Sequence, residues 1–271
     1  MRRVTPTPRV VAHRGASDDE AEHTLAAYQR ALADGADGLE CDVRLTRDGV
    51  LVCVHDRRVD RTSSGRGVLS TLELADLEEL DFGSWRSPGA PGRNLVDDGE
   101  EVDRDRTRVL TLERLLATVS DSARSVELAI ETKHPTRYAG LVELALIELL
   151  ARFGLTRPAA GRRPSVRVMS FSALSLRRIH GLAPAVPTVL LLKRLPLRYR
   201  DGVLPQRIRI AGPSLRVLRA HPGFVARVHA TGGEVHVWTV DEVADVQYVV
   251  GLAVDVVITN RPRATLAVLG R

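Results

Sequence analysis

Residues 38–55 of the chain read GLECDVRLTRDGVLVCVH. The first six are mostly apolar and predict a buried strand, in which Glu40 and Asp42 are two positions apart and share one face. Asp48-Gly49 between apolar runs is typical of a two-residue turn and predicts a hairpin. That register places His55 opposite Asp42, whereas a three-residue loop would shift the pairing by one position.

Short β-branched runs alternate with amphipathic stretches on both sides of this hairpin, a pattern typical of βα units around a parallel sheet. We expect strands at 9–12, 38–43, 126–130, 166–170, 188–192, 208–211, 234–239 and 255–259. We expect helices at 24–34, 112–120, 139–153, 174–181, 223–231 and 241–251, and a last helix from about Pro262. The pattern predicts an α/β fold, a (β/α)8 TIM barrel. A doubly wound sheet is the alternative, but no glycine-rich dinucleotide fingerprint follows the first strand.

Residues 57–108 are too long for an ordinary βα loop. They hold a Gly/Ser stretch at 63–67, a short predicted helix at 72–80 and a charged run at 97–108. We expect a single domain over residues 1–271, with this excursion inserted after the second strand's hairpin and placed over the barrel mouth. For the charged run at 97–108, two interpretations are equally good: it shapes access to the barrel mouth, or it is a solvated loop without a function.

Composition narrows the function classes. The 271 residues are 44% hydrophobic and 27% charged, as in globular proteins. No run of about 18 apolar residues predicts a membrane-spanning helix, and the first eleven residues lack a signal-peptide core. Cys41 and Cys53 give neither a disulfide framework nor zinc-ligand spacing. We therefore expect a cytoplasmic protein without a stable membrane anchor.

The net charge of +5 is the property that would favour nucleic-acid binding. The basic residues, however, are nearly all arginines and are spread along the chain among acidic residues. A nucleic-acid groove needs a concentrated basic stripe with stacking aromatics, and the chain has only four Phe, four Tyr and two Trp. We expect no nucleic-acid partner.

Charged side chains gather at the expected C-terminal ends of the first strands, where barrel active sites lie. They are His13, Arg14, Glu40, Asp42, His55, Glu131 and Lys133. Three carboxylates without a cysteine suit Mg²⁺ or Ca²⁺ better than zinc. The arginine and lysine favour a phosphate, and two histidines can act as base and acid. The set predicts hydrolysis of a phosphodiester.

The sequence resembles the glycerophosphodiester phosphodiesterases nearly end to end. The shared segments are AHRG (12–15), EHTL (22–25), LECDV (39–43), TRDG (46–49), HD (55–56), RT (61–62), Gly65, LDFGSW (80–85), IETK (130–133), SF (170–171), VWTV (237–240) and DVVITN (255–260). The resemblance implies a barrel related to phosphatidylinositol-specific phospholipase C. It also implies cleavage of a glycerophosphodiester into sn-glycerol 3-phosphate and an alcohol.

The resemblance implies a role for each matching position. The metal ligands would be Glu40, Asp42 and Glu131, holding one divalent ion, Mg²⁺ or Ca²⁺, with Mn²⁺ as a further candidate. The acid–base pair would be His13 and His55, in an order that the sequence does not give. Arg14 and Lys133 would contact the phosphate, and Trp238 would form the pocket wall. Apart from the resemblance, we expect Phe171 to lie with Trp238 at the mouth and to contact the substrate.

Two segments depart from the family pattern, at three positions. Residues 21–24 read Ala-Glu-His-Thr where the family usually has Pro-Glu-Asn-Thr, so that His23 replaces an amide near the mouth. Asn260 stands where aspartate is common. Both departures concern substrate preference more than the reaction. Glu22 is either a partner of Arg14 or a plain acid at the start of a helix.

Two functional alternatives remain. One is a lysophospholipase D-type or phospholipase C-like enzyme that acts on a lipid, and the other is a non-catalytic barrel that binds phosphorylated ligands. Because the sequence predicts no bilayer anchor, it favours water-soluble deacylated glycerophosphodiesters as substrates. The head group and the oligomeric state are not determined by the sequence.

Overall fold

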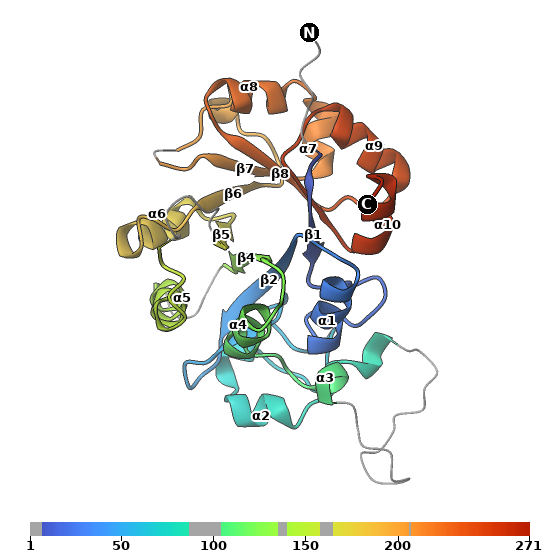
Figure 1. Ribbon diagram of the computed structural model, residues 1–271. Helices are drawn as coiled ribbons and strands as arrows, with labels where there is room; N and C mark the ends of the chain where they lie inside the picture. The colour runs from blue at the N-terminus through green and yellow to red at the C-terminus, as the bar shows by residue number, and fades with distance from the viewer. Residues whose placement is uncertain (1–6, 87–103, 135–139, 158–164, 206) are drawn as a thin grey trace.

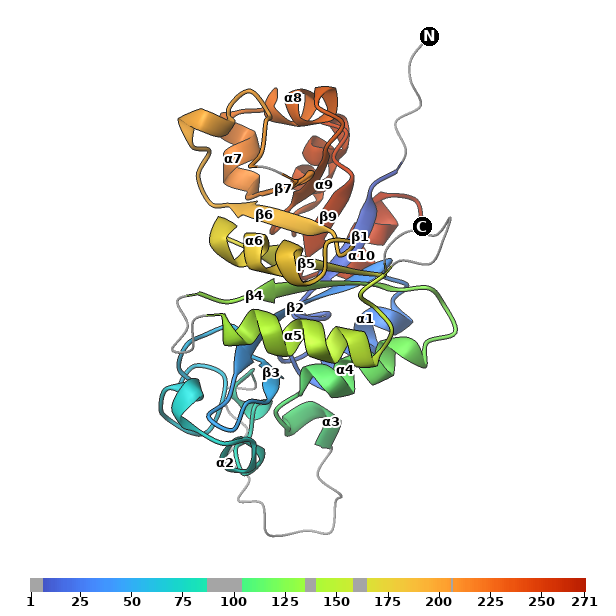
Figure 2. The same cartoon turned by 90° about the vertical axis from the view of Figure 1, so that its left-hand side faces the viewer.

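The computed structural model describes residues 7–86, 104–134, 140–157, 165–205 and 207–271. Within them, eight parallel strands close into a barrel surrounded by helices, which confirms the predicted TIM-barrel fold (Figures 1 and 2). The strands are β1 (Arg9–His13), β2 (Gly38–Leu45), β4 (Glu127–Thr132), β5 (Val166–Ser170), β6 (Thr188–Leu192), β7 (Ile210–Pro213), β8 (Glu234–Val237) and β9 (Val256–Thr259). The barrel is closed because β1 pairs with both β2 and β9.

The helices largely follow the predicted ranges. The main ones are α1 (Leu25–Ala33), α4 (Leu112–Ser120), α5 (Leu141–Arg152), α6 (Ala173–Leu182), α7 (Leu215–Ala220), α8 (Phe224–Ala230), α9 (Val243–Gly251) and α10 (Pro262–Val268). Hydroxyl groups of Thr24, Thr111, Ser172 and Ser214 cap four of them by accepting a backbone N–H of the first turn. The sequence analysis did not predict α7. Residue 139, the predicted start of α5, lies outside the described residues.

Alternation along each strand divides the core into an inner and an outer part. In β2, Leu39, Cys41 and Val43 face the surrounding helices, whereas Glu40 and Asp42 point into the barrel. Apolar side chains fill the interior below them, including Val11, Ala129, Met169, Val189, Leu191, Ile210, Val256 and Ile258. Charged groups at the C-terminal ends of the strands therefore lie above a layer of packed apolar side chains.

The predicted two-residue hairpin turn is wrong. Strand β3 (Leu51–Cys53) pairs antiparallel with β2 in a register that sets Val43 against Cys53. The loop consists of three residues, 47–49, and the Thr46 N–H donates to Val50 O at 2.9 Å. Gly49 has φ +85°, the left-handed conformation that closes such a loop without a Cβ clash. Pairing is thus shifted by one, and His55 does not lie directly opposite Asp42.

Between β3 and β4 the chain forms a small subassembly. It contains η1 (Leu69–Thr71), α2 (Leu74–Glu78), η2 (Ser84–Arg86) and α3 (Arg104–Thr107), and its own apolar cluster is made by Val52, Val54, Val59, Leu69, Leu77 and Phe82. The helix predicted at 72–80 is present as the shorter α2. Residues 97–103 of the charged run lie outside the described residues.

The connection from β6 to β7 differs from the others. In its described part it has a single short 3-10 helix, η3 (Leu197–Tyr199), in place of a full α-helix. Across the described ranges, no helix combines the length and the apolar composition needed to cross a membrane.

Candidate active site

A cavity of about 480 Å³ lies at the C-terminal ends of the barrel strands. Eight of the nine predicted site residues line it: His13, Arg14, Glu40, His55, Glu131, Lys133, Phe171 and Trp238. The ninth, Asp42, is completely buried and lies beside them. The structure therefore brings all nine residues to one place.

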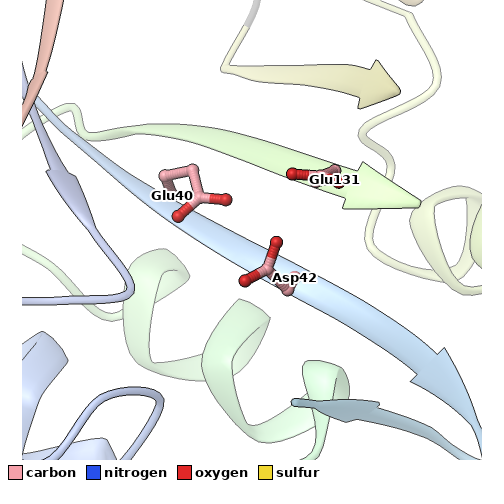
Figure 3. Close-up of side chains that lie close together, drawn as sticks. All are labelled: Glu40, Asp42 and Glu131. Atoms are coloured by element: carbon pink, nitrogen blue, oxygen red, sulfur yellow. The ribbon is translucent and has the colours of Figure 1, made fainter. Parts of the chain in front are cut away.

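The three carboxylates come from neighbouring strands. Glu40 and Asp42 share the inner face of β2, and Glu131 of β4 is the strand partner of Asp42 (Figure 3). One oxygen of each lies within 4.8 Å of the others. Burial and the charge of Asp42 raise the pKa of Glu40 well above its usual range and that of Glu131 to about 7. A divalent cation would offset this unfavourable burial, so the all-oxygen set fits a hard metal ion.

Asp42 is surrounded by nitrogen donors. Its Oδ2 lies 3.0 Å from Arg14 Nε and 3.0 Å from His23 Nε2, and its Oδ1 lies 2.9 Å from Lys133 Nζ. Burial opposes ionisation, but the hydrogen bond from His23 and the charges of Lys133 and Arg14 hold the pKa of Asp42 well below its usual range. Lys133 Nζ also lies 2.7 Å from Glu131. Asp42 is therefore the carboxyl of the set whose surroundings most favour ionisation.

The expectation that His23 sits near the mouth is wrong. It is buried beneath the site, with Nε2 on Asp42 and Nδ1 2.8 Å from the Tyr28 hydroxyl. His23 takes a left-handed backbone conformation, φ +63°, and its N–H donates to the carbonyl of Arg14. The bend turns the side chain inward, and no sequence signal predicts this direction.

His13 has a partner that the sequence analysis did not identify. Its Nδ1 lies 2.7 Å from Oδ1 of Asn260, whose amide nitrogen donates to Asp241 at 2.8 Å. Because Asp241 fixes the amide orientation, Asn260 presents oxygen and His13 Nδ1 carries the proton. Burial and the charge of Arg14 lower the pKa of His13 to about 3. The lone pair of this neutral imidazole is at Nε2, 3.9 Å from Glu40 Oε2.

His55 has a different environment. Its Nδ1 lies 2.6 Å from Oδ1 of Asp56, which in turn accepts from Arg61. Burial lowers the pKa of His55, as do the charges of Arg14 and Lys133, while the carboxylates oppose the shift. His55 is about one-third exposed at the cavity wall, whereas His13 is more enclosed.

The remaining predicted residues form the wall and the supporting contacts. Phe171 and Trp238 meet edge to face with their ring centroids 5.5 Å apart, and the Trp238 indole donates to the carbonyl of Gly212. Glu22 accepts from Arg14 at 3.0 Å and also pairs with Arg61. Of the two alternatives for Glu22, the structure supports the partner of Arg14.

Barrels of this architecture carry out their chemistry at the rim where these charges meet. Fold and site together define a barrel enzyme built for an anionic substrate. The chain belongs to the glycerophosphoryl diester phosphodiesterase family, whose sequence profile matches residues 13–264. It is therefore a phosphoric diester hydrolase.

Individual proteins support this assignment. The chain is 48% identical over 260 residues to a probable glycerophosphodiester phosphodiesterase 1 of Mycobacterium tuberculosis, covering 96% of this chain and 92% of that one. It is 33% identical over 256 residues to a glycerophosphodiester phosphodiesterase of Bacillus subtilis, covering 93% and 83%.

Solved structures share the fold. A phosphodiesterase of Oleispira antarctica, in complex with the product sn-glycerol-3-phosphate, has a TM-score of 0.81 at 21% identity and covers 98% of each chain. A putative glycerophosphoryl diester phosphodiesterase of Silicibacter pomeroyi has a TM-score of 0.80 at 24% identity, covering 97% of this chain and 94% of that one.

Proposed function

We propose that the chain hydrolyses glycerophosphodiesters to sn-glycerol 3-phosphate and an alcohol, with a divalent metal ion and a histidine acid–base pair. The single observation that carries this proposal is the meeting of three buried carboxylates with His13 and His55 in one cavity. The product bound by the Oleispira antarctica enzyme, named as sn-glycerol-3-phosphate, supports the same chemistry.

In this proposal Glu40, Asp42 and Glu131 hold the ion, Mg²⁺ or Ca²⁺, with Mn²⁺ as a further candidate. Bound there, it would supply Lewis-acid stabilisation of the charge on the phosphate oxygens and would lower the pKa of the attacking hydroxyl. The surroundings of Asp42 favour its ionised form, whereas burial disfavours the ionised forms of Glu40 and Glu131, which a bound cation would favour.

The two histidines divide the proton transfers according to their partners. His13 has its Nε2 lone pair available and a neutral amide behind it, so it suits the base that takes a proton from the attacking hydroxyl. His55 has the Asp56 carboxylate behind it, which opposes the lowering of its pKa by burial, so of the two histidines it is better suited to be the acid that protonates the leaving alkoxide. The bond that forms joins the attacking oxygen to phosphorus, and the bond that breaks joins phosphorus to the leaving oxygen.

Substrate binding uses the remaining cavity residues. Arg14 and Lys133 provide positive charge for the phosphate, and both are held in place by carboxylates of the site. Phe171 and Trp238 form an apolar wall next to the alcohol that is released.

We further propose that the chain is one domain in which the excursion at 57–108 partly covers the mouth. Its described part supports this arrangement, since Arg61 pairs with Glu22 and Arg86 donates to the carbonyl of Ser17, both on the β1–α1 loop. Asp56 and Arg57 also line the cavity.

The test is product analysis. The enzyme is incubated with glycerophosphocholine, and the products are identified by ³¹P NMR. The proposal predicts sn-glycerol 3-phosphate and choline. Phosphocholine and glycerol, or no hydrolysis of any glycerophosphodiester, would contradict it.

A further inference from the structure

Residues 193–200, which read KRLPLRYR and are here named the basic loop, lie in a basic part of the chain: residues 149–233 hold sixteen basic residues and one acidic residue, Asp201. They contain four of the 39 basic residues and none of the 34 acidic ones. The acidic residues that bring the net charge down to +5 lie mostly outside residues 149–233, so the basic loop is one part of a larger excess of positive charge.

The charges of the basic loop are also unpaired within the fold. Among the residues that the structure describes, no carboxylate lies within 4.0 Å of Lys193, Arg194, Arg198 or Arg200, and all four side chains are exposed. Arg198 instead lies over the ring of Tyr199, 4.7 Å from its centroid. In contrast, the cavity cations Arg14 and Lys133 each contact two carboxylates.

An apolar side chain projects from the middle of this charge. Leu197 is 77% exposed, the highest value among the large exposed hydrophobic residues, and Val203 just beyond the loop is 53% exposed. The loop is not loosely attached, because Tyr199 is buried in the cluster that contains Phe224 and Val228. A fixed backbone thus presents an exposed leucine between exposed cations.

The basic loop adjoins the mouth of the active site. It follows directly from the C-terminal end of β6, which pairs with β5 in the barrel (Figure 2). Lys193 and Phe171, which follow these two strands, line the same cavity. Phe171 and Leu174, after β5, are themselves 45% and 46% exposed.

We propose that the basic loop docks the enzyme reversibly onto an anionic lipid surface. Uncompensated cations at a membrane surface are attracted by acidic head groups, and an exposed leucine among them gains by entering the interface. Nucleic acid, the other common polyanion, would use aromatic rings for stacking, but the loop's one aromatic ring, Tyr199, is buried. This docking needs no membrane-spanning helix, and it concerns binding, so it does not depend on the proposed reaction.

The experiment is co-sedimentation of the full chain with vesicles of phosphatidylglycerol and phosphatidylcholine in equal parts, compared with pure phosphatidylcholine. We expect binding to the anionic vesicles alone, and about a tenfold or larger loss between 50 and 300 mM salt. The double variant Arg194→Glu/Arg198→Glu should lose at least tenfold in vesicle binding, and Leu197→Ser should weaken it as well.

The matched control is Arg114→Glu/Arg263→Glu, which makes the same charge change at exposed arginines of α4 and α10. It should bind vesicles like the wild type.

Turnover of soluble glycerophosphocholine should be unchanged in the Arg194/Arg198 variant, which keeps the binding result separate from the proposed function. Absent vesicle binding, equal binding to pure phosphatidylcholine, or an equal loss in the control would overturn the proposal. Retention on duplex DNA without vesicle binding would also overturn it.

Discussion

The Nε2 atom of His23 lies 3.0 Å from Oδ2 of Asp42, and both side chains are buried. The other ring nitrogen of His23 contacts the Tyr28 hydroxyl at 2.8 Å. Tyr28 belongs to α1 and is itself completely buried in the core cluster. A core residue therefore orients the histidine, and the histidine orients the Asp42 carboxylate.

The first prediction follows from this contact. His23→Leu removes the side-chain hydrogen bond to Asp42 and leaves its ion pairs with Arg14 and Lys133, so it should weaken metal binding by about 10–100-fold, the usual effect of losing a supporting hydrogen bond to a ligand. His23→Asn keeps a donor and should recover much of that loss. The measurement is the metal Kd by calorimetry on chelator-treated protein, with circular dichroism to check the fold. An unchanged Kd in folded His23→Leu would contradict the positioning role.

The second prediction concerns the histidine pair. His13→Ala and His55→Ala should each reduce kcat by about 10²–10⁴-fold, because each removes one proton-transfer group. His180→Ala and His221→Ala, outside the cavity, are the controls and should retain nearly full activity. Wild-type rates in His55→Ala would rule out its assignment as the acid.

The third prediction is about substrate class. Without vesicles, kcat/KM should be higher for glycerophosphocholine or glycerophosphoethanolamine than for a lysophospholipid below its micellar concentration. The cavity of about 480 Å³ carries charged side chains from the ends of β1, β2 and β4, which suit a short polar substrate. Its apolar lining, which includes Phe171 and Trp238, is the feature that favours an acyl chain. The opposite ranking would support the lipid-directed alternative and leave the metal and histidine roles intact.

The fourth prediction concerns stability at the opposite end of the barrel. His236 is buried against Arg167 and Glu234, and burial is the main cause that lowers its pKa to about 4. The pKa of His236 is lower in the folded protein than the value near 6.5 expected in the unfolded chain. Its contribution to stability is therefore present at pH values above 6.5 and is lost as the pH falls toward 4. Between pH 7 and 4.5, wild type should therefore lose about 2–3 kcal/mol more unfolding free energy than His236→Gln.

Urea unfolding at the two pH values provides the measurement. His221→Gln, at a partly exposed position, is the control and should follow the wild type. Parallel pH dependence in wild type and His236→Gln would show that His236 does not contribute in this way.

The local sequence pattern was sufficient to predict much of the active site. Period-two alternation places Glu40 and Asp42 on one face, and parallel βα order brings Glu131 beside them, so the carboxylate set follows from the sequence. The strands and most helices follow from the same periodicities. The hairpin register does not, because it depends on whether two or three residues form the turn.

Some contacts between distant segments could not be predicted. The inward position of His23 depends on a left-handed backbone conformation that a non-glycine residue rarely adopts. The contact of His13 with Asn260 depends on barrel closure between β1 and β9. Likewise, the net charge could be read from composition, but the absence of carboxylates around the basic loop is a property of the folded surface.

Metal dependence of turnover is the most direct test of the central claim that Glu40, Asp42 and Glu131 form a catalytic metal site. Glycerophosphocholine hydrolysis is measured after excess chelator, and again after adding Mg²⁺, Ca²⁺ or Mn²⁺ above the chelator concentration. We predict that the chelator abolishes turnover, that at least one of these ions restores it, and that folded Glu40→Ala and Asp42→Ala stay nearly inactive with any ion. Full turnover in excess chelator would contradict the claim.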